Sequence, residues 1–181
     1  MLLAFALAAC TTEDPDTGDS GDTSGDSGPT ITAPPLVINE VLAKNDAYNT
    51  DNAGEYDDWL ELYNPSDTIL QLDGFYLTDT ESEPTLYQFP AGKGIQGQGY
   101  LVVWCDKQVE QETADELHAT FKLGAKGDFV FLSYSEDNQV VTADSVRWDS
   151  DQTADLAAAR VPDGSKNWVN QPPTYDESNG G

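Results

Sequence analysis

The stretch Asp58-Trp59-Leu60-Glu61-Leu62-Tyr63-Asn64-Pro65 contains the clearest β-strand pattern in this sequence. Its aliphatic residues are separated by one position. Successive side chains of a β-strand point to opposite faces, so a repeat of two residues is typical of a strand. Leu60 and Leu62 therefore share one face, and the other face carries Trp59, Glu61 and Tyr63. The strand should end at Asn64-Pro65, because proline cannot donate to a strand ladder. A short alternating strand that ends in a turn is typical of an all-β fold.

Similar short runs occur on both sides of this stretch. They are rich in β-branched and aromatic residues, and most are separated by Gly, Asp, Asn or Pro. The expected strands span residues 36–42, 75–78, 86–89, 100–105, 120–122, 129–134, 139–146 and 157–161. Only residues 108–117 favour a helix, as a polar, exposed turn. Many short strands with turn signals between them predict a β-sandwich or barrel built as one domain.

The composition changes sharply before the first strand. Residues 11–35 read TTEDPDTGDSGDTSGDSGPTITAPP and carry six carboxylates but no basic residue. Such a segment cannot bury enough apolar surface to fold, so we expect a disordered acidic tether. Its Asp spacing is loosely similar to calcium-loop repeats, but the full loop pattern is absent. We place the folded domain at 36–165 and a C-terminal extension at 166–181.

The first ten residues are apolar and end in Leu7-Ala8-Ala9-Cys10. Small residues before a cysteine resemble the lipobox of a bacterial lipoprotein, and this run is too short to span a bilayer. We therefore expect a signal peptide at 1–10 and lipid attachment at Cys10. No Lys or Arg occurs before Lys44, so the true start is expected upstream. Thr11 in place of aspartate favours the outer membrane or cell surface over the inner membrane.

The second cysteine, Cys105, follows an apolar run and is expected to be buried as a small hydrophobic residue. A disulfide between Cys10 and Cys105 is the alternative. With only two cysteines, disulfides do not hold this domain together.

The charge of the chain excludes one class of partner. The 181 residues include 33 acidic and 8 basic ones, for a net charge of -25. Binding a nucleic acid backbone needs Lys and Arg, so no nucleic acid partner is expected. An anionic bilayer would also repel the chain, so membrane attachment must come from the lipid.

A series of motifs in this order resembles the lamin tail domain family. The motifs are Ile38-Asn39-Glu40-Val41, Asp58 to Pro65, Leu72-Asp73-Gly74-Phe75-Tyr76-Leu77-Thr78-Asp79, Phe89-Pro90, Gly99-Tyr100-Leu101-Val102-Val103, His118-Ala119-Thr120-Phe121-Lys122-Leu123 and Gly127-Asp128. A trailing Arg160-Val161-Pro162-Asp163-Gly164 with Trp168 resembles the end of the bacterial members. The resemblance implies an immunoglobulin-like β-sandwich of the kind found in nuclear lamins and in secreted or surface proteins of bacteria. It also implies a domain that accompanies enzymes without being a catalyst.

Within these motifs the residues have structural interpretations. Gly74 and Gly99 stand at expected turns, where positive φ is tolerated. Glu61 lies between two aromatic residues and is either exposed to solvent or bonded to a buried partner. Arg147 and the backbone of a neighbouring loop are the two candidate partners.

The residues available for catalysis are few. His118 is the only histidine, which excludes a zinc site with two imidazoles, and no Gly-x-Ser-x-Gly motif accompanies it. We interpret His118 as a strand-edge residue and predict no catalytic residue, no metal site and no cofactor. An acidic-site hydrolase is a remote alternative, because 33 acidic residues create close carboxylate pairs by chance.

The loop from Asn45 to Asp58 is the best candidate for a ligand site. Its carboxylates suit calcium, although a solvated loop is the favoured interpretation. These acids are Asp46, Asp51, Glu55, Asp57 and Asp58. Nearby aromatic residues would form a platform for sugar or protein if they were exposed together; they are Tyr48, Tyr56, Trp59 and Tyr63.

Together these features predict a lipid-anchored, non-catalytic binding or interaction module of the cell envelope. Its expected partners are the membrane, through the lipid, and an unidentified envelope protein or polysaccharide. A calcium-dependent adhesion module or a carbohydrate-binding module is the alternative.

Overall fold

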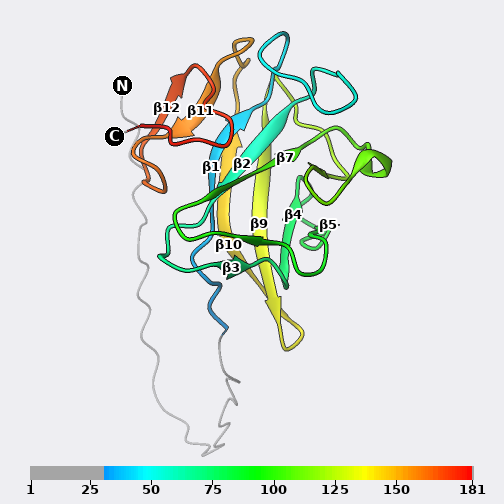
Figure 1. The fold of residues 1–181 in the computed structure, drawn as a ribbon, viewed down its shortest axis with the longest axis vertical. Coiled ribbons are helices and arrows are strands. Elements are labelled where there is room, and N and C mark those ends of the chain that lie inside the picture. Colours follow the sequence, from blue (N-terminus) through cyan, green and yellow to red (C-terminus); the bar gives the residue numbers. More distant parts are fainter. Residues whose placement is uncertain (1–30, 181) are drawn as a thin grey trace, which may run out of the picture. The chain divides into compact units, whose positions relative to one another are not determined.

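The computed structural model describes residues 31–180, which form β-strands and one short 3-10 turn (Figure 1). The predicted signal peptide, Cys10 and residues 11–30 of the predicted tether lie outside the described residues. The strands are β1 (Val37–Leu42), β2 (Trp59–Tyr63), β3 (Leu70–Gln71), β4 (Phe75–Thr78), β5 (Tyr87–Gln88), β6 (Gly94–Ile95), β7 (Tyr100–Trp104), β8 (Leu117–His118), β9 (Asp128–Glu136), β10 (Gln139–Trp148), β11 (Ala157–Arg160) and β12 (Trp168–Gln171), and the 3-10 turn is η1 (Val109–Gln111). None of the described residues form a helix long and apolar enough to cross a membrane.

The strands form two main sheets and one small one. The six-stranded sheet has the order β12-β11-β1-β2-β7-β8, and Figure 1 shows it running from β12 in red to β7 in green. The four-stranded sheet has the order β10-β9-β4-β5, and β3 pairs with β6. Every pairing is antiparallel except that of β7 with β8. The predicted all-β, immunoglobulin-like β-sandwich is confirmed.

The core fills the space between the two main sheets. Leu60 and Leu62 of β2 and Val103 of β7 belong to the same buried cluster as Phe75 of β4 and Leu132 of β9. Alternation along β2 thus places the two leucines in the core, as the sequence predicts. Burying apolar area at about 25 cal/mol per Å² is the main stabilising contribution of such a core.

The opposite face of β2 is also covered. Trp59 is 0% exposed and forms a second cluster with Leu42, Trp104 and Ala157. Tyr175, which follows β12, packs against this cluster. The C-terminal extension set apart at 166–181 therefore contributes β12 and a covering segment to the six-stranded sheet. Its polar composition did not indicate this role, since only one aromatic residue lies beyond Trp168.

Arg160 at the end of β11 links the two sheets. Its Nη2 lies 2.9 Å from Asp144 Oδ2 of β10, and its Nε donates to Ile38 O of β1 at 2.8 Å. The guanidinium also lies over the Trp168 ring, 4.6 Å from the ring centroid. The trailing motif noted in the sequence is therefore a structural tie.

Some local predictions are wrong. The helix expected at 108–117 is reduced to η1, and the strand expected at 120–122 is replaced by β8 and an isolated bridge between Asp106 and Lys122. The sequence did not predict β3 and β6, because strands of two residues show little periodicity, nor β12, which lies in the polar C-terminal extension.

Gly74 and Gly99, which the sequence places at turns, differ in their backbone conformation. Gly74 has φ +84°, and a Cβ built there would lie 2.8 Å from Ser135 O, so the turn requires glycine. Gly99 does not have positive φ; Gln98 before it does, at 56°.

Candidate functional site

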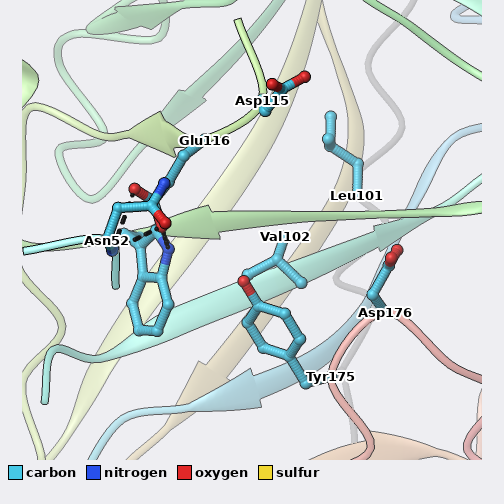
Figure 2. A pocket seen from close by; sticks show the side chains of 8 residues that line it. Asn52, Leu101, Val102, Asp115, Glu116, Tyr175 and Asp176 are labelled. Atoms are coloured by element: carbon cyan, nitrogen blue, oxygen red, sulfur yellow. Dashed lines mark hydrogen bonds between the residues drawn. The ribbon is translucent and has the colours of Figure 1, made fainter. Parts of the chain in front are cut away.

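A pocket of about 310 Å³ opens on the face of the six-stranded sheet that points away from the sandwich core (Figure 2). Four chain segments line it: the β1–β2 loop, β7, the segment before β8 and the segment after β12. The lining residues are Asn52, Leu101, Val102, Trp104, Asp115, Glu116, Tyr175 and Asp176. Val102 and the Tyr175 ring form apolar walls, and the lining includes three acids but no basic side chain.

One wall belongs to residues 172–180, which we call the C-terminal clasp. Thr174 donates through its N–H and its hydroxyl to Glu40 of β1, and the Asp176 N–H donates to Glu61 Oε2 at 2.7 Å. The Tyr175 ring meets Trp59 edge-on at 5.4 Å and Trp104 at 5.9 Å between centroids. The clasp is thus held by two buried carboxylates and two buried indoles.

Those two carboxylates are paired residues on adjacent strands, and both are 0% exposed. Burial raises the pKa of Glu61 from 4.5 to about 8; the hydrogen bond from Asn39 opposes this, and the charge of Glu40 adds to it. Burial likewise raises the pKa of Glu40 to about 7, against the hydrogen bonds from Thr174. Of the two partners considered for Glu61, the loop backbone is the correct one. Arg147 lies over the Phe129 ring instead, 4.8 Å from its centroid.

Glu116 organises the opposite wall. Its Oε1 accepts from Trp104 Nε1 at 3.1 Å, and both carboxylate oxygens accept from the Asn52 N–H, as the dashed lines in Figure 2 show. These bonds fix the β1–β2 loop against β7. Asp115 and Asp176 stand at the rim and are exposed.

The pocket adjoins an unpaired strand edge. β8 pairs only with Val103 and Trp104, so no strand of residues 31–180 pairs with the outer edge of β7 from Tyr100 to Val102. Ala119 N–H donates to Trp104 O at 2.7 Å, which shows that the Trp104 backbone faces this edge. The backbone N–H and C=O groups of successive strand residues point to alternate edges of the strand. Those of Val102 and Tyr100 therefore point to the same outer edge as those of Trp104.

His118 lies at a strand edge, as expected, but it is 0% exposed. Its Nδ1 is 2.6 Å from Asp106 Oδ2, and its Nε2 is 3.5 Å from Glu116 Oε2. Within residues 31–180 no hydroxyl or thiol forms a hydrogen bond with the ring. The sequence did not indicate Asp106 as the partner, because it lies in a loop twelve residues away.

Three of the five acids of the Asn45–Asp58 loop form a cluster, and the other two lie apart from it. Ligand atoms of Asp51, Glu55 and Asp57 all lie within 4.8 Å of one another. Asp58 instead accepts from the Asn45 N–H at 2.8 Å, and burial raises its pKa to about 6. Asp46 is exposed at the surface.

The four aromatic residues do not form a platform. Tyr48 and Tyr56 are 41% and 53% exposed, but Trp59 is buried and donates to Asn49 Oδ1. Tyr63 stacks on Tyr100 at 5.1 Å between centroids. The condition for a joint surface, exposure of all four side chains together, is not met, because β2 points Trp59 under the clasp. Cys105 lies directly after β7, is buried as expected, and forms no disulfide within residues 31–180.

Comparison with known families agrees with this architecture. The sequence model of the lamin tail domain matches residues 29–155. The chain belongs to the lamin tail domain family. Lamin tail domains are immunoglobulin-like interaction modules, and the matched span ends before β11, β12 and the clasp. No curated protein matches the chain.

Proposed function

We propose that this lamin tail domain binds an extended, basic segment of a partner protein along the outer edge of β7. The observation that supports this most is the acidic, aromatic pocket that adjoins the unpaired backbone of Tyr100 to Val102. An extended peptide gains affinity by adding a strand to such an edge, and pockets for alternate side chains give it specificity.

The charge of the pocket selects the partner. Asp115, Glu116 and Asp176 line it without a basic neighbour in the lining, and the chain has a net charge of -25. A lysine or arginine of the bound segment would place its charge among the acids and its methylene groups against Val102 and Tyr175. Opposite charges also increase the association rate and discriminate against acidic partners.

The location of the protein is a second part of the proposal. The sequence Leu7-Ala8-Ala9-Cys10 supports lipid attachment at Cys10 of an exported bacterial lipoprotein, on the outer membrane or cell surface. The acidic residues 11–35 would then hold the domain away from the anionic membrane. Labelling of cells with palmitate tests this point. The wild-type chain should incorporate the label, and the Cys10→Ser variant should not. Labelling that persists in Cys10→Ser would contradict the anchor.

A selection of random peptides on the folded domain tests the binding proposal. Selected peptides should be enriched in Lys or Arg next to an apolar residue. Binding should fall at least tenfold in Asp176→Lys and Asp115→Lys. The matched control is Asp73→Lys, which reverses an exposed charge in the turn before β4 and should bind like the wild type. Acidic peptides, or equal binding to all variants, would contradict the proposal.

A further inference from the structure

A second cluster of side chains lies behind the pocket, where the β1–β2 loop meets the segment after β7 and β8. Ligand atoms of Asp51, Asp106 and His118 all lie within 4.8 Å of one another, and all three residues are buried. Asp51 also belongs to the group with Glu55 and Asp57. Three carboxylates and one imidazole therefore surround Asp51, and the five residues come from three parts of the chain.

The hydrogen bonding of this cluster is incomplete. Among residues 31–180, three buried side-chain atoms have no hydrogen-bond partner: Asp51 Oδ2, Asp57 Oδ2 and His118 Nε2. All three belong to this cluster. Native domains satisfy nearly all buried polar groups, and leaving one unsatisfied is unfavourable.

The hydrogen bonds that do exist orient the free oxygen of Asp51. The Glu55 N–H donates to Asp51 Oδ1 at 2.8 Å, which leaves Oδ2 for the cluster. Asp51 is only 5% exposed, so water has little access to that oxygen from outside. The loop backbone, closed by bonds between Asp51 and Glu55 in both directions, holds this orientation.

The charges of the cluster are poorly balanced. Lys122 Nζ lies 3.9 Å from Asp57 Oδ1, but the lysine side chain is 57% exposed. Ligand atoms of Asp57 and Glu55 lie within 4.8 Å of Asp51, so three carboxylates of the loop face one another. The contact between His118 Nδ1 and Asp106 Oδ2 leaves Asp51 Oδ2 and Asp57 Oδ2 without a partner among residues 31–180. A compact positive charge among these groups would satisfy them.

We propose that Asp51, Asp106 and His118 bind one divalent transition-metal ion, Zn²⁺ or Mn²⁺. The carboxylate of Asp57 lies beside that of Asp51 and adds negative charge next to the ion. The imidazole decides the class of metal: Ca²⁺ and Mg²⁺ take oxygen ligands, whereas mixed imidazole and carboxylate sets suit first-row metals. The site differs from the calcium loop considered from the sequence, because Asp106 and His118 come from other segments. It does not depend on the proposed peptide binding.

Asn52 and Glu116 connect the proposed metal site to the pocket. Asn52 follows Asp51 and donates to Glu116, and Glu116 Oε2 lies 3.5 Å from His118 Nε2. Metal binding would therefore order the β1–β2 loop at the wall of the pocket.

Titration calorimetry and thermal unfolding of the 181-residue chain with Cys10→Ser, after EDTA treatment, test the proposal. One equivalent of Zn²⁺ or Mn²⁺ should bind and raise the Tm, and Ca²⁺ should bind more weakly than both. Asp51→Asn should weaken affinity at least ~10-fold, since outer-shell changes alone cost 10–100-fold. Asp46→Asn, an exposed acid of the same loop, should bind like the wild type.

Failure to bind stoichiometrically, uptake that Asp51→Asn does not weaken, or tighter binding of Ca²⁺ would each overturn the proposal. A measurement on the unsubstituted site guards against a variant that misfolds. Electron spin echo modulation of bound Mn²⁺ should show coupling to a ¹⁴N nucleus of His118. A spectrum without nitrogen coupling would remove His118 from the ligand set and overturn the assignment.

Discussion

Replacing Glu61 with glutamine should change how the stability of this domain depends on pH. Glu61 is buried between β1 and the clasp, and its pKa is about 8 instead of 4.5. The folded chain thus binds this proton more tightly than the unfolded chain does. Between about pH 4.5 and 8, unfolding releases the proton, so the contribution of Glu61 to stability falls as pH rises. Glu61→Gln removes this ionisation and keeps the shape of the side chain.

The structure sets the size of the effect. At 1.36 kcal/mol for each tenfold change in proton affinity, a pKa of about 8 in place of 4.5 corresponds to about 5 kcal/mol. Relaxation of the surroundings lowers that upper limit, because the effective dielectric constant of buried sites exceeds that of a dry interior. We expect the variant to gain ~2 kcal/mol relative to the wild type between about pH 5 and 9, or roughly 4–8 °C in Tm for a domain of this size.

Urea unfolding followed by tryptophan fluorescence provides the assay, since the chain has four tryptophans. The free energies of unfolding of wild type and Glu61→Gln are compared at several pH values in that range. Asp163, whose pKa is lowered from 3.8, titrates below the range. Glu83→Gln, an exposed change in a turn, should give a difference that does not vary with pH. A pH-independent difference for Glu61→Gln as well would show that the Glu61 carboxyl is not held protonated by burial.

Three further changes test the packing. Gly74→Ala should lower the free energy of unfolding by ~2–3 kcal/mol, because its Cβ would meet Ser135 O. Gly92→Ala, also at positive φ but in open space, should lower it by only ~1 kcal/mol, and thermal unfolding compares the two variants. Arg160→Ala should lose ~3 kcal/mol, because Asp144 keeps its hydrogen bond from the Ile38 N–H but loses its positively charged partner. A double-mutant cycle with Asp144→Asn should show a coupling of at least ~1 kcal/mol, and additive losses would contradict the tie between the sheets. Trp59→Ala should lose ~3–5 kcal/mol and Tyr56→Ala less than ~0.5 kcal/mol in urea unfolding, since only Trp59 is buried.

The sequence predicts the fold where periodicity is strong. The alternation in Asp58 to Tyr63 placed Leu60 and Leu62 in the core, and the flanking runs located β1, β4, β7, β9, β10 and β11 within a few residues. The motif order indicated the family that the comparison identifies. These features are local, so a single sequence reveals them.

The candidate site was less predictable because distant segments form it. Asp51, Asp106 and His118 come from three loops or strand ends whose meeting depends on the pairing of β7 with β8. Tyr175 and Asp176 lie in a polar tail, and only the long-range bonds to Glu40 and Glu61 bring them to the sheet. The hydrophobic periodicity of a sequence and the spacing of its motifs contain no information on contacts between such distant segments.

Backbone NMR of the folded domain with a selected peptide locates the bound peptide residue by residue. Peptide binding along β7 should shift the amide signals of Tyr100 and Val102 and slow their exchange with solvent, and should also shift the Trp104 indole N–H. The same titration with Asp176→Lys should require at least tenfold more peptide. Shifts confined to the four-stranded sheet, or unchanged exchange at Tyr100 and Val102 in the saturated complex, would contradict binding at this edge.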